Sequence, residues 1–205
     1  MRAPPCGGGS ETQYPTKAER RKYAPGLGGY LLSLLSRLFG ENKERARLRP
    51  LYAALVAAGR APAWYREGQV PDTVEGRFDM ISSLLALALL RLEREGEAAR
   101  RDSVLLTEAF IDDMDGSLRQ IGIGDFTVGK HVGKLMGALG GRLEAFRAAL
   151  GDGGDLDGAV RRNIFRDAPL SPDAVTFVTA GLRRFEAGLS GRSLEQMLAG
   201  DLPAA

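Results

Sequence analysis

The residue types that most enzymes use for catalysis are scarce in this sequence of 205 residues. It has one cysteine, Cys6, and one histidine, His131. A single thiol forms neither an intramolecular disulfide nor a cysteine-based zinc site, and it is typical of proteins from a reducing compartment. A histidine metal cluster or a Ser-His-Asp triad would depend on His131 alone. We therefore expect no catalytic site, no metal site and no cofactor.

One short motif is similar to a phosphate-binding loop. Residues 124–130 follow the pattern G-x-x-x-x-G-K. In such loops the next residue is Ser or Thr, whose hydroxyl binds magnesium, and a parallel strand precedes the loop. Here the next residue is His131, and the preceding segment has a helical pattern. The sequence disfavours a nucleotide site, and we predict that the chain is not an enzyme.

Charged residues gather in the middle of the chain. Four of them have the spacing i, i+4, i+7 and i+11, which places them on one face of a helix: Glu108, Asp112, Asp115 and Arg119. The acidic residues do not have the spacing of a calcium-binding EF-hand loop. Two interpretations stay open, namely a face exposed to solvent and a docking surface for a basic partner.

Glycine recurs every four residues in the segment that follows, at Gly129, Gly133, Gly137 and Gly141. Each glycine inside a helix costs about 0.8–1 kcal/mol relative to alanine, so four in one helix need an explanation. Small residues allow another backbone to approach closely. The row predicts close packing against a helix, either a neighbour in the same bundle or a helix of a partner.

Positive charge gathers near the N-terminus, although the formal net charge of the whole chain is only +2. Residues 17–49 contain nine Lys and Arg residues against three Glu residues. An amphipathic helix over 27–39 followed by a basic link could lie on an anionic membrane or contact RNA. The alternative is a core helix followed by a solvated linker.

The elements that would position these residues are all helical. Residues 1–26 hold four of the ten prolines and a Gly-Gly-Gly-Ser stretch, so we expect a disordered leader there. Apolar spacing predicts a helix over 27–39 that Gly40 ends, and a second helix over 48–58. Asp72 and Glu75, at capping-box spacing, open a long helix over 73–94. Its apolar residues lie on nearly every side, which predicts the central helix of a bundle.

Further helices are predicted over 105–121, 126–150, 156–166 and 172–188, with a short one ending near Leu198. Asp125 can cap the second of these, and Ser171 with Pro172 opens the fourth. There is no strand signal, and the longest apolar run, Leu84–Leu90, is too short to span a bilayer. The expected fold is an all-α, single-domain helical bundle over residues 27–205.

Three blocks stand out between Leu51 and Arg142, namely residues 70–79 (VPDTVEGRFD), 110–119 (FIDDMDGSLR) and 122–130 (GIGDFTVGK). In order and spacing they resemble the ubiquinol–cytochrome c chaperone family, the assembly chaperones of respiratory complex III. One departure is the stretch Ala138–Arg142, where family members usually carry an aromatic pair before the Gly-Arg.

The resemblance implies a non-catalytic chaperone that binds newly made cytochrome b and promotes assembly of ubiquinol–cytochrome c reductase. It further implies a small partner subunit, contact with the ribosome and no DNA binding. The expected location is the cytoplasmic face of the inner membrane, or the matrix side in mitochondria, with peripheral membrane contact. The alternative is a ribosome- or RNA-binding accessory protein acting through the basic segment 37–49.

The client site predicted on the resembling blocks combines the acidic helix, the glycine turn and the lysine-bearing helix. Its charged residues would pair with the client, and its glycines would allow close approach. The predicted residues are Asp113, Asp115, Arg119, Gly122, Gly124, Asp125, Lys130, Gly133 and Lys134.

Overall fold

The computed structural model describes the backbone of residues 27–120, 128–166, 168 and 171–204, and the side chains from Lys43 onward except 115, 117–132, 167, 169–170 and 205. The predicted leader over 1–26 lies outside these residues. The chain divides into two units, Met1–Asn42 and Lys43–Ala205. The packing described below is that of the second unit.

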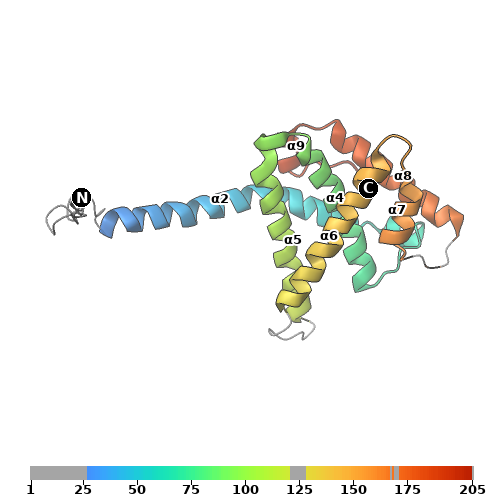
Figure 1. The fold of residues 1–205 in the computed structure, drawn as a ribbon, viewed down its shortest axis with the longest axis horizontal. Helices are drawn as coiled ribbons and strands as arrows, with labels where there is room; N and C mark the ends of the chain where they lie inside the picture. The colour runs from blue at the N-terminus through green and yellow to red at the C-terminus, as the bar shows by residue number, and fades with distance from the viewer. Residues whose placement is uncertain (1–26, 121–127, 167, 169–170, 205) are drawn as a thin grey trace, which may run out of the picture. The chain divides into compact units, whose positions relative to one another are not determined.

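Throughout the described ranges the chain forms helices and no strand, which confirms the all-α prediction (Figure 1). In chain order the elements are α2 (Leu27–Gly59), α3 (Pro62–Arg66), α4 (Val74–Glu93), the 3-10 turn η1 (Gly96–Ala99), α5 (Arg100–Gln120), α6 (Val128–Leu150), α7 (Leu156–Asn163), α8 (Pro172–Ser190) and α9 (Leu194–Leu198). None of the helices described is both long and apolar enough to cross a membrane.

Helix α4 is the centre of the bundle, as its apolar pattern predicts. Every residue from Met80 to Leu90 is buried, and the helix packs against α5, α6 and α8. Its N-cap differs from the prediction: Thr73 accepts a hydrogen bond from the Gly76 backbone N–H at 3.1 Å, while Asp72 binds Arg77 instead. Both Asp and Thr suit an N-cap, so the sequence alone does not select between adjacent candidates.

The prediction of two separate helices over 27–39 and 48–58 is wrong. The chain forms one helix from Leu27 to Gly59, with no break at Gly40 and no separate link. An interior glycine weakens a helix without ending it, and the Lys, Glu, Ala and Arg residues after it are good helix formers. From Lys43 onward α2 brings Leu48, Leu51 and Leu55 into the core.

Side-chain caps begin the last three helices. Asp155 caps α7, and Ser171 caps α8 with Pro172 at its first position, the latter as predicted. Ser193 and Gln196 form a capping box at the start of α9. Helix α7 ends at Asn163, earlier than the predicted residue 166, and Ile164 and Phe165 beyond it remain buried. Hydrophobic residues past the last turn extended the sequence pattern beyond the helix.

Candidate functional site

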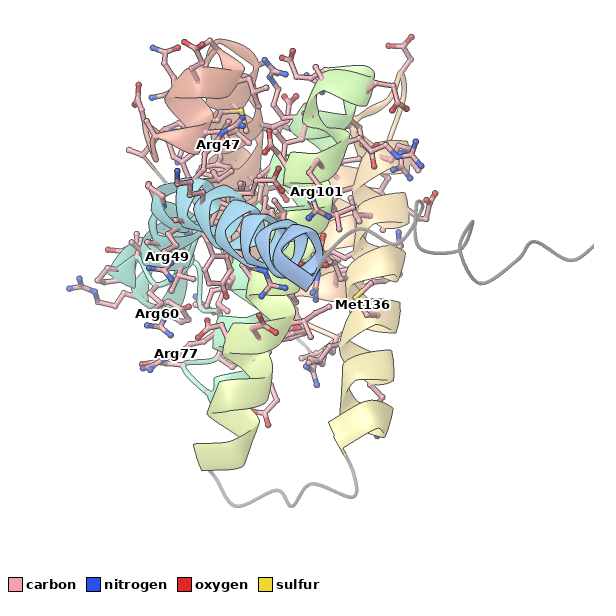
Figure 2. The ribbon with its side chains drawn as sticks, turned by 90° about the vertical axis from the view of Figure 1, so that its left-hand side faces the viewer. Arg47, Arg49, Arg60, Arg77, Arg101 and Met136 are labelled. Carbon is pink, nitrogen blue, oxygen red and sulfur yellow. The ribbon has the colours of Figure 1, made fainter. Side chains whose placement is uncertain are left out.

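An apolar groove opens between α4, α5 and α6. Its volume is about 440 Å³, and its apolar lining comprises Leu89, Val104, Ile111, Met136 and Leu143. Large hydrophobic side chains are usually buried, but Val104 is 46% exposed and Met136 is 42% exposed. Figure 2 shows Met136 on α6, at the right of that view. We call this feature the α5–α6 groove; it offers apolar surface that no described residue covers.

Three of the four glycines in the row on α6 lie open rather than packed against described residues, and the surroundings of Gly129 fall outside the described residues. A Cβ atom added at Gly133, Gly137 or Gly141 would meet no described atom within 4 Å, and all three residues are exposed. Packing of these glycines against a neighbouring helix of the same bundle is therefore wrong. The remaining interpretation, a partner helix on this face, stays a prediction. Because Gly133 lies three residues before Met136 on the same helix, the two are neighbours on the surface of α6, and the open glycine face borders the groove.

The acidic face of α5 already has a basic partner inside the molecule. Arg45 on α2 binds Glu108 at 3.0 Å and Asp112 at 3.4 Å. The hydroxyl of Tyr52 donates to the Asp113 carboxylate at 2.7 Å. The face exposed to solvent is confirmed for Glu108 and Asp112, whose side chains are 41% and 68% exposed, and both also pair with Arg45 of α2. An external basic partner for this face stays a prediction.

Burial and Asp113 together change the acid–base behaviour of Tyr52. Burial is the larger cause and raises the pKa of the Tyr52 phenol; the hydrogen bond to Asp113 raises this pKa further. The phenol therefore keeps its proton to a higher pH than a free tyrosine does, and its hydrogen bond to Asp113 joins α2 to α5. Asp113, one of the predicted client-binding residues, thus has a structural contact of its own.

The basic segment 37–49 is part of α2, and α5 neutralises some of its charge. Besides the pairs of Arg45, Arg47 binds the nearly buried carboxylate of Asp102 at 3.0 Å. One pair has the opposite arrangement of charge: Glu44 of the segment accepts a hydrogen bond from Arg101 on α5 at 3.1 Å. Arg47 and Arg101 are both labelled in Figure 2. The positive charge that this segment offers an external polyanion is smaller than the sequence indicates.

The structure describes only part of the predicted client site. Asp113 is half-buried on α5, and Gly133 and Lys134 are exposed on α6, the helix that packs against α5. The side chains of Asp115, Arg119 and Lys130, carried by the same two helices, fall outside the described residues, as do Gly122, Gly124 and Asp125 of the turn.

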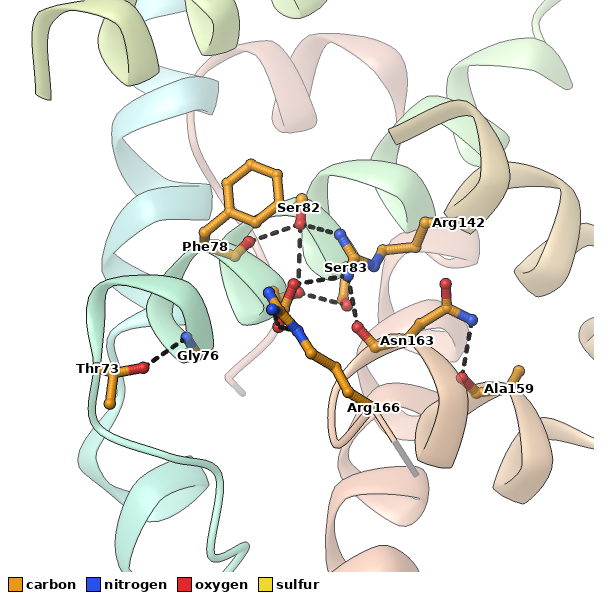
Figure 3. Close-up of polar contacts among 10 residues, drawn as sticks. Thr73, Gly76, Phe78, Ser82, Ser83, Arg142, Ala159, Asn163 and Arg166 are labelled. Atoms are coloured by element: carbon orange, nitrogen blue, oxygen red, sulfur yellow. Dashed lines mark hydrogen bonds and ion pairs between the residues drawn. The ribbon is translucent and has the colours of Figure 1, made fainter. Parts of the chain in front are cut away.

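A buried polar cluster that the sequence analysis missed joins α4, α6 and the end of α7 (Figure 3). Arg142 binds the Asp79 carboxylate at 2.9 Å, with side chains only 4% and 5% exposed. Arg142 also donates to the Ser82 hydroxyl and to the backbone carbonyl of Asn163. Arg166, which is exposed, binds the other Asp79 oxygen at 3.1 Å. We call these five residues the Asp79 cluster.

Burial and charge act against each other in the Asp79 cluster. Burial is the largest influence, raising the pKa of Asp79 and lowering that of Arg142, while each residue opposes the shift of the other. Because the ion pair is enclosed, it does not face the groove, and its direct role is to hold α6 on α4. A signal was present in the sequence: Asp79 interrupts an apolar helix, and both residues lie in or beside the resembling blocks.

No group of three His, Cys, Asp or Glu side chains that could hold a metal ion occurs among the residues described. Among the described residues, the surface best suited to bind a partner is the apolar α5–α6 groove together with the open glycine face beside it.

Comparisons with known proteins agree with the helical architecture. A family model described as ubiquinol-cytochrome C chaperone matches residues 66–204. The crystal structure of the Cbp3 homolog from Brucella abortus is similar to this chain with a TM-score of 0.69 and 35% sequence identity, over 85% of this chain and 96% of that chain. No curated protein matches the chain.

Proposed function

Because the chain belongs to the ubiquinol–cytochrome c chaperone family, a membership that its match over residues 66–204 shows, we propose that it binds newly made cytochrome b and promotes assembly of complex III. The action is non-catalytic: the chaperone covers apolar client surface until the client is assembled. It takes place at the membrane periphery, on the cytoplasmic side in a bacterium. A small partner subunit and the ribosome are the further expected partners.

The α5–α6 groove supports this proposal most directly. An apolar surface of this kind is typical of sites for protein partners, and it suits an apolar client segment. Met136 at the groove has a flexible, polarizable side chain that adapts to differently shaped apolar partners. The open glycines next to it let a client helix approach the α6 backbone closely.

The predicted charged residues complete the proposed site. Lys134 is exposed on α6, and Lys130 lies one helical turn before it. Glu93 and Glu108 line the groove itself. Charges around an apolar site favour one orientation of a partner more than they add affinity. We propose that Asp115, Arg119 and residues 122–125 contact the same client.

Site-specific photo-crosslinking tests the placement. A photoreactive amino acid replaces Met136 in the groove or, as a matched control, Val74, which is 63% exposed at the start of α4 and does not line the groove. Both proteins are expressed together with cytochrome b. We expect a crosslink to cytochrome b from position 136 and none from position 74. Equal crosslinking from both positions would contradict the groove as the client site.

Charge reversal tests the polar part of the proposed site. Asp115→Lys and Lys130→Glu are expected to weaken both cytochrome b binding and complex III assembly. If both substitutions leave these two properties unchanged, the polar placement is wrong.

Binding to RNA or the ribosome through segment 37–49 is the competing hypothesis, and salt distinguishes it. Phosphate contacts weaken steeply as ionic strength rises, whereas burial of apolar surface does not. We expect co-purification of cytochrome b with the tagged chain to persist at high salt. Enrichment of ribosomal proteins alone, lost at high salt, would favour the accessory function.

A further inference from the structure

A second pocket lies where the end of α2, helix α3 and the start of α4 meet. Its volume is about 420 Å³, and it is lined by Arg60, Pro62, Tyr65, Arg66, Asp72 and Arg77. It shares no residue with the α5–α6 groove. Figure 2 shows Arg60 and Arg77 close together at the left of that view.

The pocket lining carries a surplus of positive charge. Three guanidinium groups and one carboxylate give it a formal charge of +2. Asp72 already accepts from the Nε of Arg77 at 2.7 Å, and this hydrogen bond lowers the pKa of the Asp72 carboxyl. Arg60 and Arg66 form no ion pair with any described residue. Two arginines that pair with no described acidic residue thus line one cavity together with Arg77.

Hydrogen bonds fix the backbone that carries these arginines. The Tyr65 hydroxyl donates to the Gly59 carbonyl at 2.7 Å, and the Trp64 indole donates to the Ala58 carbonyl at 2.9 Å. Both bonds tie α3 to the end of α2. At the start of α4, Gly76 lies so close to Pro71 that an added Cβ would be 1.9 Å from the Pro71 carbonyl oxygen. The backbone that carries the arginines is therefore held in place, which removes the backbone part of the entropic cost of binding a ligand.

We propose that Arg60, Arg66 and Arg77 form a binding site for a phosphate monoester. The planar guanidinium group binds phosphate oxygens in a bidentate manner, which suits it to this anion. A dianionic phosphate monoester matches the pocket charge of +2 better than a singly charged carboxylate does. Its source is either phosphatidic acid, a phospholipid whose headgroup is a phosphate monoester, or a soluble phosphate monoester, and both present the same group to the three arginines.

The test uses a pocket variant and a control variant with the same change of charge. The pocket variant is Arg60→Gln with Arg66→Gln; both side chains are exposed, so the fold is expected to be kept, which circular dichroism checks. Arg77 is left in place because it binds Asp72. The control is Arg183→Gln with Arg184→Gln, two exposed arginines on α8.

Two probes carry the phosphate monoester in different forms. Glycerol 3-phosphate is the soluble probe, followed by calorimetric titration of the full chain. Vesicles of phosphatidylcholine with or without phosphatidic acid are the membrane probe, followed by flotation. An arginine near an anionic membrane changes binding about fivefold, so the pocket variant should bind phosphatidic acid vesicles roughly thirtyfold more weakly than the unmodified chain. The control variant should bind nearly as well as the unmodified chain.

The outcomes show whether the site binds a phosphate monoester and, if it does, whether the ligand is a lipid or a soluble ester. Vesicle binding that the pocket variant alone loses supports a lipid headgroup, and binding of glycerol 3-phosphate without vesicle binding supports a soluble ester. Equal losses in the two variants would show a general charge effect and overturn the site. It would also be overturned by the absence of binding to both probes, or by binding only to single-stranded RNA used as a third probe. None of these results depends on cytochrome b, so failure here leaves the proposed function standing.

Discussion

At the scale of single residues, the enclosed ion pair of Asp79 and Arg142 carries the largest energetic consequence. Breaking a buried pair by removing one partner leaves a charge without compensation, which costs more than the net contribution of the intact pair. Arg142 and Arg166 bind the same carboxylate, yet one is 4% and the other 60% exposed. The two arginines therefore differ in burial while sharing a partner.

We expect Arg142→Met to lower the free energy of unfolding by about 3 kcal/mol, because Asp79 then keeps only its exposed partner. Arg166→Met should cost less than about 1 kcal/mol, since exposed ion pairs contribute little. Urea unfolding followed by the fluorescence of Trp64, the only tryptophan and a buried one, measures both values. Equal effects of the two substitutions would show that burial does not govern this pair.

The raised pKa of Tyr52 predicts that the free energy of unfolding depends on pH. In the folded chain this pKa is raised above the ordinary tyrosine value of about 10, so above about pH 10 the unfolded chain releases this proton while the folded chain retains it. The folded state then binds more protons, and stability falls as pH rises. Between about pH 9 and 11, the unmodified protein should lose stability more steeply than Tyr52→Phe, as urea unfolding at several pH values would show. Parallel curves would contradict the assignment.

At the scale of elements, α2 and α5 bring together opposite charges that each helix carries separately. Most of these pairs are exposed and contribute little, but Asp102 is nearly buried and depends on Arg47 for compensation. The tyrosine contact to Asp113 adds a hydrogen bond at the same interface. The acidic face of α5 thus stabilises the position of α2 from Lys43 onward.

The described fold does not require glycine at Gly133, Gly137 or Gly141 of α6, because each position has room for a side chain. Gly137→Ala should raise the free energy of unfolding by about 0.5–1 kcal/mol, because a Cβ there meets nothing and alanine is the better helix former. Gly59→Ala is the contrasting variant: its Cβ would lie 2.8 Å from Ile81, so it should destabilise. Thermal unfolding compares the two. A destabilising Gly137→Ala would show that something covers this face.

At the scale of the whole molecule, the described hydrophobic core begins at Leu48 and continues into α9. Its centre is α4, and Trp64 from α3 packs edge-on to Phe177 of α8 with ring centroids 6.4 Å apart. Segments distant in sequence thus share one core. This core lies in the unit Lys43–Ala205.

We expect a chain that starts at Lys43 to fold with a free energy of unfolding within about 0.5 kcal/mol of the full chain, because every residue of the described core lies in the unit Lys43–Ala205. Chemical unfolding of both proteins measures the difference. A loss of several kcal/mol would mean that residues 1–42 contribute to the core.

The sequence by itself determined the fold class, most helix positions, the central place of α4 and the cap at Ser171. These are local properties, set by the spacing of apolar residues and by the chemistry at helix ends. Its family resemblance likewise rested on contiguous blocks, which the family model confirms.

Only the tertiary structure decided which charges meet. Asp79 and Arg142 are 63 residues apart, and Arg45 and Glu108 are also 63 apart, so no local pattern pairs them. Tertiary packing likewise left Gly133, Gly137 and Gly141 of α6 uncovered by any described residue. The physical reason is that the orientation of one helix against another depends on the fit of many side chains at once, whereas the formation of a helix depends mainly on residues within a few positions of one another.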